Sequence, residues 1–196
     1  MTRRAGLDKA AVVEEAARLI DEEGIEQLSL GRLAERLGVR TPSLYNHVAG
    51  LPGLKRDLTV YCLRELIGPL TRAVIGKARA EAIFALFDAY LAYAREKPGR
   101  YLLTLQAPPP DDKEWRQLGE QALDIVRAIL EPYRLDEEAT MHAIRGLRVI
   151  IRGAVEMEMA GAFAMPISLD DSFHWLVDLF IKGLEQHAST VSYENH

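Results

Sequence analysis

The sequence lacks several features that mark specialised classes of protein. It has a single cysteine among 196 residues, Cys62, so it can form no intrachain disulfide, and this fits a reducing compartment. No apolar run approaches the roughly 18 residues that a membrane span needs. Arg3 and Arg4 precede a charged segment rather than the apolar stretch of a secretion signal. These absences predict a cytoplasmic protein without a membrane partner.

Signatures of catalysis and metal binding are also missing. Gly76-Lys77 lacks the rest of a phosphate-binding loop, and there is no dinucleotide fingerprint and no Cys/His cluster. Glu138 and His142 stand four residues apart and would supply only half of a metal site. We therefore expect no catalytic residues, no cofactor and no metal. The alternative, an enzyme, would reveal itself by turnover of a small metabolite.

Helical periodicity runs through almost the whole sequence. Alternating patterns typical of strands are absent, and Gly and Pro lie between the periodic stretches rather than inside them. Asp8 and Ser29 each precede an apolar helical face, as helix caps do, and these faces end at Gly24 and Gly38. The sequence predicts an all-α fold of about nine helices.

The chain beyond Gly50 is expected to form the longer helices. They are predicted at about residues 51–75, 79–97, 100–106, 112–130, 136–160 and 168–187. Pro69 leaves open whether the first of these is bent or broken. The predicted division is a three-helix domain at 1–50 and a helical domain at 51–196.

Residues 39–48, VRTPSLYNHV, predict a short third helix. Thr41 would cap it, with Pro42 in the first helical position, where the missing N–H costs nothing. On a helical wheel the apolar and polar residues take opposite sides: Leu44 and Val48 on one, and Ser43, Asn46 and His47 on the other. Two short helices joined by a glycine-containing turn describe a helix-turn-helix, whose outward edge fits a DNA major groove. The alternative is the solvated face of a three-helix bundle.

Basic residues concentrate around this segment. Residues 29–56 carry five basic side chains and one acidic one in a chain of net charge -5: Arg32, Arg36, Arg40, Lys55 and Arg56 against Glu35. A local basic patch on an acidic body can bind phosphate while the body repels it.

The stretch LGRLAERLGVRTPSLYNHVAGLPGLKRDL resembles the DNA-binding region of TetR/AcrR-family transcriptional regulators, in its LAxxLGV and SLYxHV motifs and its leucine-rich continuation. The resemblance covers about residues 7–58. It implies a ligand-responsive DNA-binding regulator, most often a repressor that a small molecule releases from a palindromic double-stranded operator. It implies further that Ser29 contacts phosphate, that Arg40, Thr41, Pro42 and Ser43 approach bases, and that Tyr45, Asn46 and His47 hold the DNA backbone. The family's usual phosphate-binding lysine is replaced by Leu51, and either Lys55 or Arg56 would take its place.

The segment RGAVEMEMAGAFAMPISLDDSF, residues 152–173, is similar to a ligand-domain type of one branch of this family. That branch shows a His-Gly pair, a Leu-Glu, a Gly-x-Phe and a proline before the last helix. Gly153, Glu158, Gly161, Phe163 and Pro166 fit this pattern, while Arg152 and Met157 stand where His and Leu are usual.

The last two predicted helices have apolar residues on more than one face, and such helices must be covered all round. A second copy of the chain would supply the cover, and the resemblance likewise implies a homodimer. The residues predicted for this interface are Ile151, Val155, Phe173, Leu176, Val177, Phe180 and Leu184. The alternative is a purely intramolecular core.

Aromatic side chains recur along the middle helices, where they would line a ligand pocket, as in the family, or simply form the core. The pocket residues predicted are Tyr61, Cys62, Phe87, Tyr90, Tyr101 and Trp115, with His142 or Arg145 to anchor an acidic group. The expected effector is a small, mainly apolar or aromatic molecule. A remaining alternative is a helical adaptor that binds protein, whose binding would be insensitive to salt.

Overall fold

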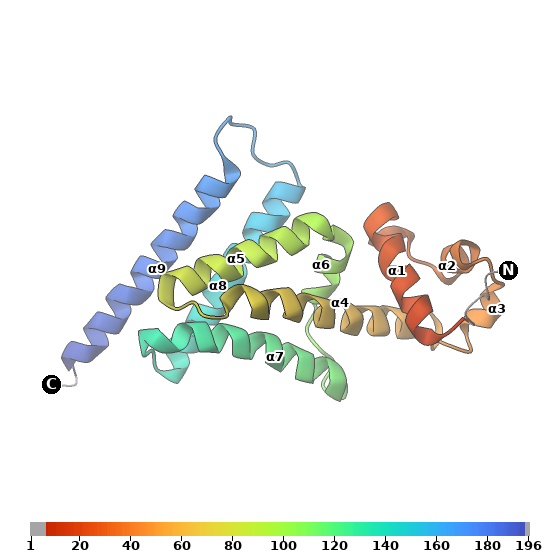
Figure 1. Cartoon of the computed structure of the whole chain (residues 1–196), viewed down its shortest axis with the longest axis horizontal. Helices are drawn as coiled ribbons and strands as arrows, with labels where there is room; N and C mark the ends of the chain where they lie inside the picture. Colours follow the sequence, from red (N-terminus) through yellow and green to blue (C-terminus); the bar gives the residue numbers. More distant parts are fainter. Residues whose placement is uncertain (1–6, 195–196) are drawn as a thin grey trace. The chain divides into compact units, whose positions relative to one another are not determined.

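The computed structural model describes residues 7–194, with side chains described as far as His187, and the described chain is entirely helical (Figure 1). It contains α1 (Lys9–Glu23), α2 (Leu30–Leu37), α3 (Thr41–Leu44), α4 (Gly50–Val74), α5 (Arg79–Glu96), α6 (Pro98–Thr104), α7 (Lys113–Leu130), α8 (Glu137–Met159) and α9 (Leu169–Glu194). Two 3₁₀ turns, η1 (Ile25–Gln27) and η2 (Glu131–Tyr133), complete these elements. The all-α prediction is confirmed. No helix in the described part has the length and apolar character that crossing a membrane requires.

The first two helices begin and end where the sequence predicts. The Asp8 carboxylate accepts a hydrogen bond from the Ala11 N–H at 2.7 Å, and the Ser29 hydroxyl accepts one from the Arg32 N–H at 3.2 Å. These caps satisfy backbone donors that have no partner inside the helix. Gly38 ends α2 in the left-handed conformation with φ 65°, which glycine adopts without steric cost.

Three observed helices, α3, α6 and α9, differ from the predictions, and the structure also decides whether α4 breaks at Pro69. α6 covers Pro98–Thr104 rather than about 100–106, and α9 continues to Glu194 rather than ending near residue 187. α4 is continuous from Gly50 to Val74, with Pro69 inside it, so the helix does not end there. α3 is shorter than predicted. Its N-cap position is Arg40, which makes no side-chain capping hydrogen bond, so Thr41 is the first helical residue and Pro42 the second. The residues after α3 continue as hydrogen-bonded turns, because the N–H groups of His47 and Val48 both donate to the Leu44 carbonyl, at 2.9 and 3.0 Å.

The described chain forms two compact units. Unit 1 holds the described residues up to Glu65 together with Glu96–Gly119, and unit 2 holds Leu66–Arg95 together with the described residues from Glu120 onward. α1, α2, α3, the first part of α4 and α6 therefore lie in unit 1. We call residues 7–50 of this unit the head.

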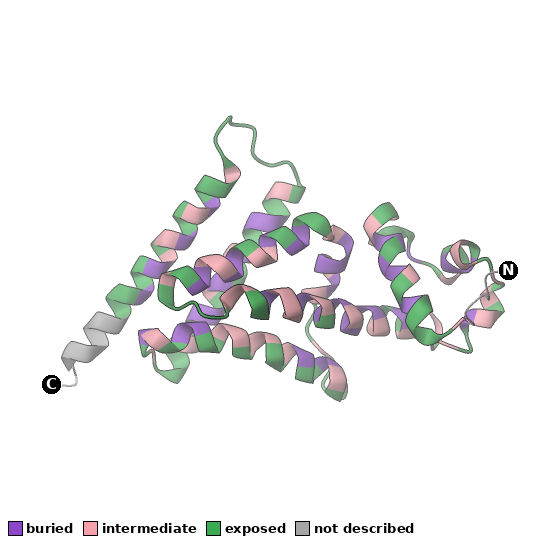
Figure 2. Ribbon diagram, viewed as in Figure 1, coloured by how far each residue is buried: buried purple, intermediate pink, exposed green. Residues whose placement is uncertain are grey.

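Each unit has its own buried residues, whose ribbon is coloured purple in Figure 2. In unit 1 the helices of the head share one core with α4 and with Leu103 of α6. In unit 2 α8 packs against α9, and Val177 of α9 is completely buried. Phe87 of α5 meets Phe173 of α9 edge to face, with ring centroids 6.3 Å apart.

Candidate nucleic-acid interface

The residues of α3 and the following turns divide into an anchored side and an outward side, as the helical wheel predicts. Leu44 is 0% exposed and Val48 is 4% exposed, so they fix the segment to the core of the head. The polar residues point outward to different extents: Tyr45 and Asn46 are exposed, and Ser43 and His47 are half-buried. The segment therefore presents hydrogen-bonding groups on a rigid support.

The residues just before this edge also reach the surface. Arg40 and Pro42 are exposed, and Thr41 is half-buried. Ser29 is exposed at the start of α2, although its hydroxyl already accepts the capping bond. All eight residues of the head that are predicted to contact DNA therefore expose at least part of their surface.

The basic residues of α2 are engaged by acidic residues rather than free. Arg32 binds Glu23 through Nε and Nη2, each at 2.9 Å, and binds Glu35 through Nη1 at 2.7 Å. Arg36 binds three carboxylates of α1, with distances of 2.7 Å to Glu15 and Glu22 and 3.0 Å to Glu23. These pairs raise the pKa of both guanidinium groups, so the arginines stay charged while their charge is balanced locally.

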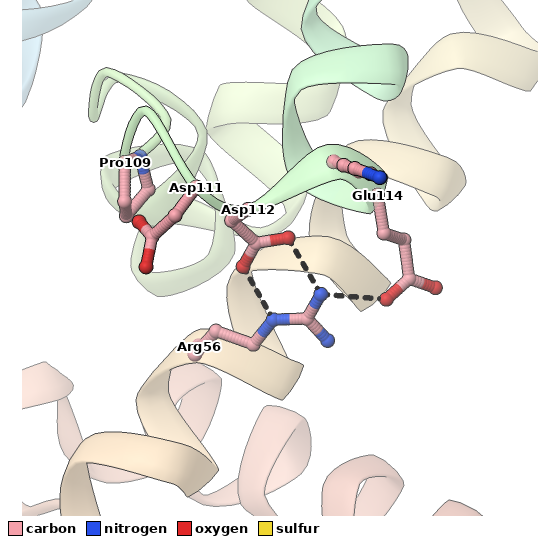
Figure 3. Close-up of a pocket in the computed structure, with 6 residues that line it drawn as sticks. Arg56, Pro109, Asp111, Asp112 and Glu114 are labelled. Carbon is pink, nitrogen blue, oxygen red and sulfur yellow. Dashed lines mark hydrogen bonds and ion pairs between the residues drawn. The ribbon is translucent and has the colours of Figure 1, made fainter.

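Arg56 is engaged in the same way in a surface hollow of unit 1 (Figure 3). Its Nε and Nη2 bind the two carboxylate oxygens of Asp112 at 2.6 and 2.7 Å, and Nη2 also reaches Glu114 at 2.7 Å. Hydrogen bonding to Arg56 lowers the pKa of Asp112 to about 2. Lys55, the neighbouring residue, is exposed and has no ion pair among the described residues.

The basic patch counted from the sequence is therefore much weaker in the structure. Three of its five cations, Arg32, Arg36 and Arg56, bind carboxylates that lie mostly far away in the sequence. Arg40 and Lys55 are the cations of that set that bind no carboxylate among the described residues, and both are exposed. The two alternatives for the missing phosphate-binding lysine are thus unequal, because the Arg56 guanidinium already binds three carboxylates, whereas Lys55 has no ion pair among the described residues.

A buried ion-pair network that the sequence did not reveal ties α6 to the head. Arg100 of α6 is 8% exposed, and its Nε binds Asp21 of α1 at 2.6 Å. Its Nη1 binds both oxygens of Glu65 in α4, at 2.8 and 2.9 Å. Lys97 also binds Glu65 at 2.9 Å, and the Arg100 guanidinium lies 5.9 Å from the ring centroid of Tyr61. One side chain thus connects three helices of unit 1.

The surroundings of this network are tightly packed. A Cβ at Gly99 would lie 2.8 Å from the carbonyl carbon of Ile20, and closer still to its oxygen, so the close approach of α6 to α1 requires glycine. Burial raises the pKa of Asp21 although Arg100 lowers it, and the Asp21 Oδ1 has no hydrogen-bond partner. Cys62 beside the network is completely buried, and burial raises the pKa of its thiol to about 12.

The predicted pocket residues fall into both units. Tyr61, Cys62, Tyr101 and Trp115 lie in unit 1, whereas Phe87, Tyr90, His142 and Arg145 lie in unit 2. Cys62, Phe87, Tyr101 and Trp115 are buried, and Tyr61 and Tyr90 are half-buried. Arg145 and His142 are exposed, and His142 lies on an open, mainly apolar groove of about 370 Å³ between α8 and α9.

The predicted dimer residues are mostly covered by their own chain. Five of them are at most 8% exposed: Ile151, Val155, Phe173, Val177 and Leu184. Leu176 is 41% exposed, and Phe180 is half-buried against Gly146. A second face of the same helices carries large exposed apolar side chains, with Val149 71%, Trp175 66% and Leu179 43% exposed. A partner would meet these residues rather than the five buried ones.

Two family models match the sequence. The one described as "Bacterial regulatory proteins, tetR family" matches residues 12–47, and the one described as "Tetracyclin repressor-like, C-terminal domain" matches residues 83–180. The HTH-type transcriptional regulator Rv0681 of Mycobacterium tuberculosis is 34% identical, covering 98% of this chain and 89% of that protein. The HTH-type regulator YobS of Bacillus subtilis is 31% identical, with 94% and 96% covered.

Solved structures show the same fold. A TetR variant from Acinetobacter baumannii in complex with minocycline is 21% identical and superposes with a TM-score of 0.71, covering 93% of this chain and 98% of that one. A protein from Rhodococcus sp. RHA1 is 19% identical with a TM-score of 0.79, covering 94% and 99%.

Proposed function

Because the chain belongs to the TetR family of HTH-type transcriptional regulators, we propose that it is a repressor that binds an inverted-repeat operator as a homodimer and leaves it when a small molecule binds. The observation that carries the DNA-binding part is the edge at residues 40–47. Leu44 and Val48 hold this edge rigidly from inside, while its polar groups reach the surface. Such an edge can enter a major groove and read base pairs there.

The contacts of the edge are proposed to divide by function. Arg40 is exposed at the start of α3, where its guanidinium could bind guanine through two hydrogen bonds. Tyr45, Asn46 and His47 would bind phosphate oxygens, which fix the register of the protein on DNA without reading sequence. Lys55 is the proposed phosphate contact of α4, because Arg56 is already bound to Asp112.

The second face of α8 and α9 supports the homodimer. Val149 of α8 and Trp175, Leu176 and Leu179 of α9 are all more than 40% exposed. Trp175 and Leu179 stand one helical turn apart, and large apolar side chains that share an exposed face typically mark an interface. A two-fold dimer presents its two heads to half-sites about 34–36 Å apart, which calls for a near-palindromic operator.

The proposed effector is a small, mainly apolar or aromatic molecule. The aromatic content of the middle helices favours it, and a related fold accommodates minocycline in the TetR variant from Acinetobacter baumannii. Such a ligand weakens DNA binding only to the extent that it prefers the conformation that does not fit DNA.

The direct test is selection of bound duplexes from a random DNA pool at about 150 mM salt. Enrichment of an inverted repeat would establish sequence-specific binding by a dimer and would provide the operator for a ligand screen by release. If no sequence is enriched, the selection is repeated with protein that has been unfolded and refolded to strip bound ligand. If neither the protein as purified nor the refolded protein enriches a sequence, the proposed function is refuted.

A further inference from the structure

Arg32 lies beside the predicted phosphate contact Ser29, in the first turn of α2. Its backbone N–H donates to the Ser29 hydroxyl at 3.2 Å, and its side chain is 42% exposed. Phosphate oxygens are bound in protein–DNA complexes chiefly by such exposed cations and by groups at helix starts. Arg36 is a poorer candidate, because its side chain is only 19% exposed and binds three carboxylates of α1.

The two carboxylates that hold Arg32 differ in their surroundings. Glu23 comes from α1, has a side chain 24% exposed, and engages Nε and Nη2 together, so it connects two helices. Glu35 lies three residues further along α2, has a side chain 70% exposed, and engages only Nη1. Exposed pairs within one helix contribute little to stability, because water screens both charges. The fold therefore needs Glu23 much more than it needs Glu35.

We propose that Glu35 competes with a DNA phosphate for Arg32 and thereby lowers the affinity of the protein for DNA of any sequence. The inference rests on the proposed DNA-binding function. In the wild type the Glu35 carboxylate occupies Nη1 and keeps a phosphate oxygen from it; without Glu35 a phosphate oxygen binds there, while Glu23 keeps the guanidinium in place. Because every DNA sequence carries the same phosphates, this competition reduces the sequence-independent part of binding. The base contacts of residues 40–43 then supply a larger share of the total affinity.

The remaining charge of the head supports this reading. With Arg32 and Arg36 balanced by carboxylates, Arg40 is the exposed cation left on the described α2–α3 segment. Phosphate contacts by cations make binding fall with salt, with a slope of about 0.9 for each phosphate neutralised. Releasing Arg32 from Glu35 would add one such contact to each head.

The test compares Glu35→Gln with a matched control, Glu14→Gln. Glu14 and Arg18 form a similar exposed pair on α1, with N–O distance 2.7 Å and side chains 53% and 52% exposed. Dissociation constants are measured by fluorescence anisotropy on the selected operator and on a scrambled duplex, over a series of salt concentrations. Glu35→Gln should tighten binding to both duplexes by the same factor, about two- to fivefold for two heads, and steepen the salt dependence by about two for a dimer. Glu14→Gln should change affinity less than about twofold.

The same two affinity measurements in an Arg32→Gln background show whether the gain in affinity from Glu35→Gln depends on Arg32. There Glu35→Gln should give no gain, because the proposed phosphate contact is absent. The proposal is overturned if Glu35→Gln leaves affinity unchanged in a protein that binds the operator, if the gain persists without Arg32, or if Glu14→Gln gives an equal gain. A wild-type protein that binds no duplex would overturn the proposed function together with this inference. Glu35→Ala, measured in parallel, must agree with Glu35→Gln.

Discussion

Replacing Arg100 with methionine should destabilise unit 1, because Asp21 would lose the cation that compensates its burial. Glu65 keeps Lys97 as a partner, at 2.9 Å. Among the described residues, only Arg100 hydrogen-bonds the Asp21 carboxylate, and Asp21 Oδ1 has no partner there. Methionine fills a similar volume, so packing against α1 is largely kept.

The size of the effect follows from the burial of the pair. Removing one partner of a buried ion pair costs about 3–5 kcal/mol. The side chain of Arg100 is 10% exposed and that of Asp21 is 19% exposed, so water screens the remaining charge only slightly. With that small discount we expect a loss of about 2–4 kcal/mol in the free energy of unfolding at pH 7.

The pH dependence of the loss identifies Asp21 as its source. The pKa of Asp21 is raised in the folded protein, mainly by burial, so the folded state binds the proton more tightly than the unfolded state. Such a group costs stability above its folded pKa, and the cost is relieved as pH falls through that value. Without Arg100 the pKa rises further, so the deficit of the variant relative to wild type should shrink between about pH 7 and pH 4.

Urea unfolding followed by tryptophan fluorescence measures this directly. Trp115 of unit 1 is 6% exposed, and a Trp175→Phe background removes the signal of the exposed tryptophan in unit 2. Adding Asp21→Asn to Arg100→Met should restore at least half of the lost stability, because the uncompensated charge is gone. A loss below about 0.5 kcal/mol, or no recovery with Asn, would refute the reasoning.

Three further outcomes are expected. Arg40→Ala should relax the sequence preference at one or two base positions, with a loss of about 1–3 kcal/mol in the binding free energy that separates the preferred base from the others. Tyr45→Phe combined with His47→Ala should weaken binding equally on all sequences. Repeating the selection and titrating several duplexes distinguishes the two patterns. Lys55→Ala should lower the salt slope of a dimer by about two, and an unchanged slope would show that Lys55 does not touch phosphate. Trp175→Glu should shift the protein from dimer to monomer in analytical ultracentrifugation, because a charge would replace a large exposed apolar side chain; an intact dimer would place the interface elsewhere.

Local signals in the sequence were enough to place most of the helices. Caps such as Asp8 and Ser29 and the stop at Gly38 act within a few residues, so their effects can be read directly from the sequence. The length of α3 was less predictable. The residues after Leu44 form hydrogen-bonded turns, and a helical wheel does not distinguish such turns from a continuing helix.

Charge balance and burial depend on partners far away in the sequence, and there sequence reasoning fell short. Residues 29–56 look basic when counted alone, but Arg36 meets Glu15 of α1 and Arg56 meets Asp112 before α7. The Arg100 network joins residues 35 and 79 positions apart, and no periodic pattern signals it.

The apolar helices posed a related difficulty. A helical wheel shows that α9 has two apolar faces, but it does not show which face the chain itself covers. Val177 turned inward and Trp175 outward, although both are apolar residues of the same helix.

The burial of Cys62 also determines its chemistry. A thiol with a pKa of about 12 is almost entirely protonated at neutral pH, and only the thiolate reacts rapidly with alkylating reagents and oxidants. Since the side chain is 0% exposed, modification requires the core of unit 1 to open. The rate at which a maleimide labels this single thiol therefore reports how often the core of unit 1 opens. The protein thus carries an intrinsic probe of local unfolding in unit 1.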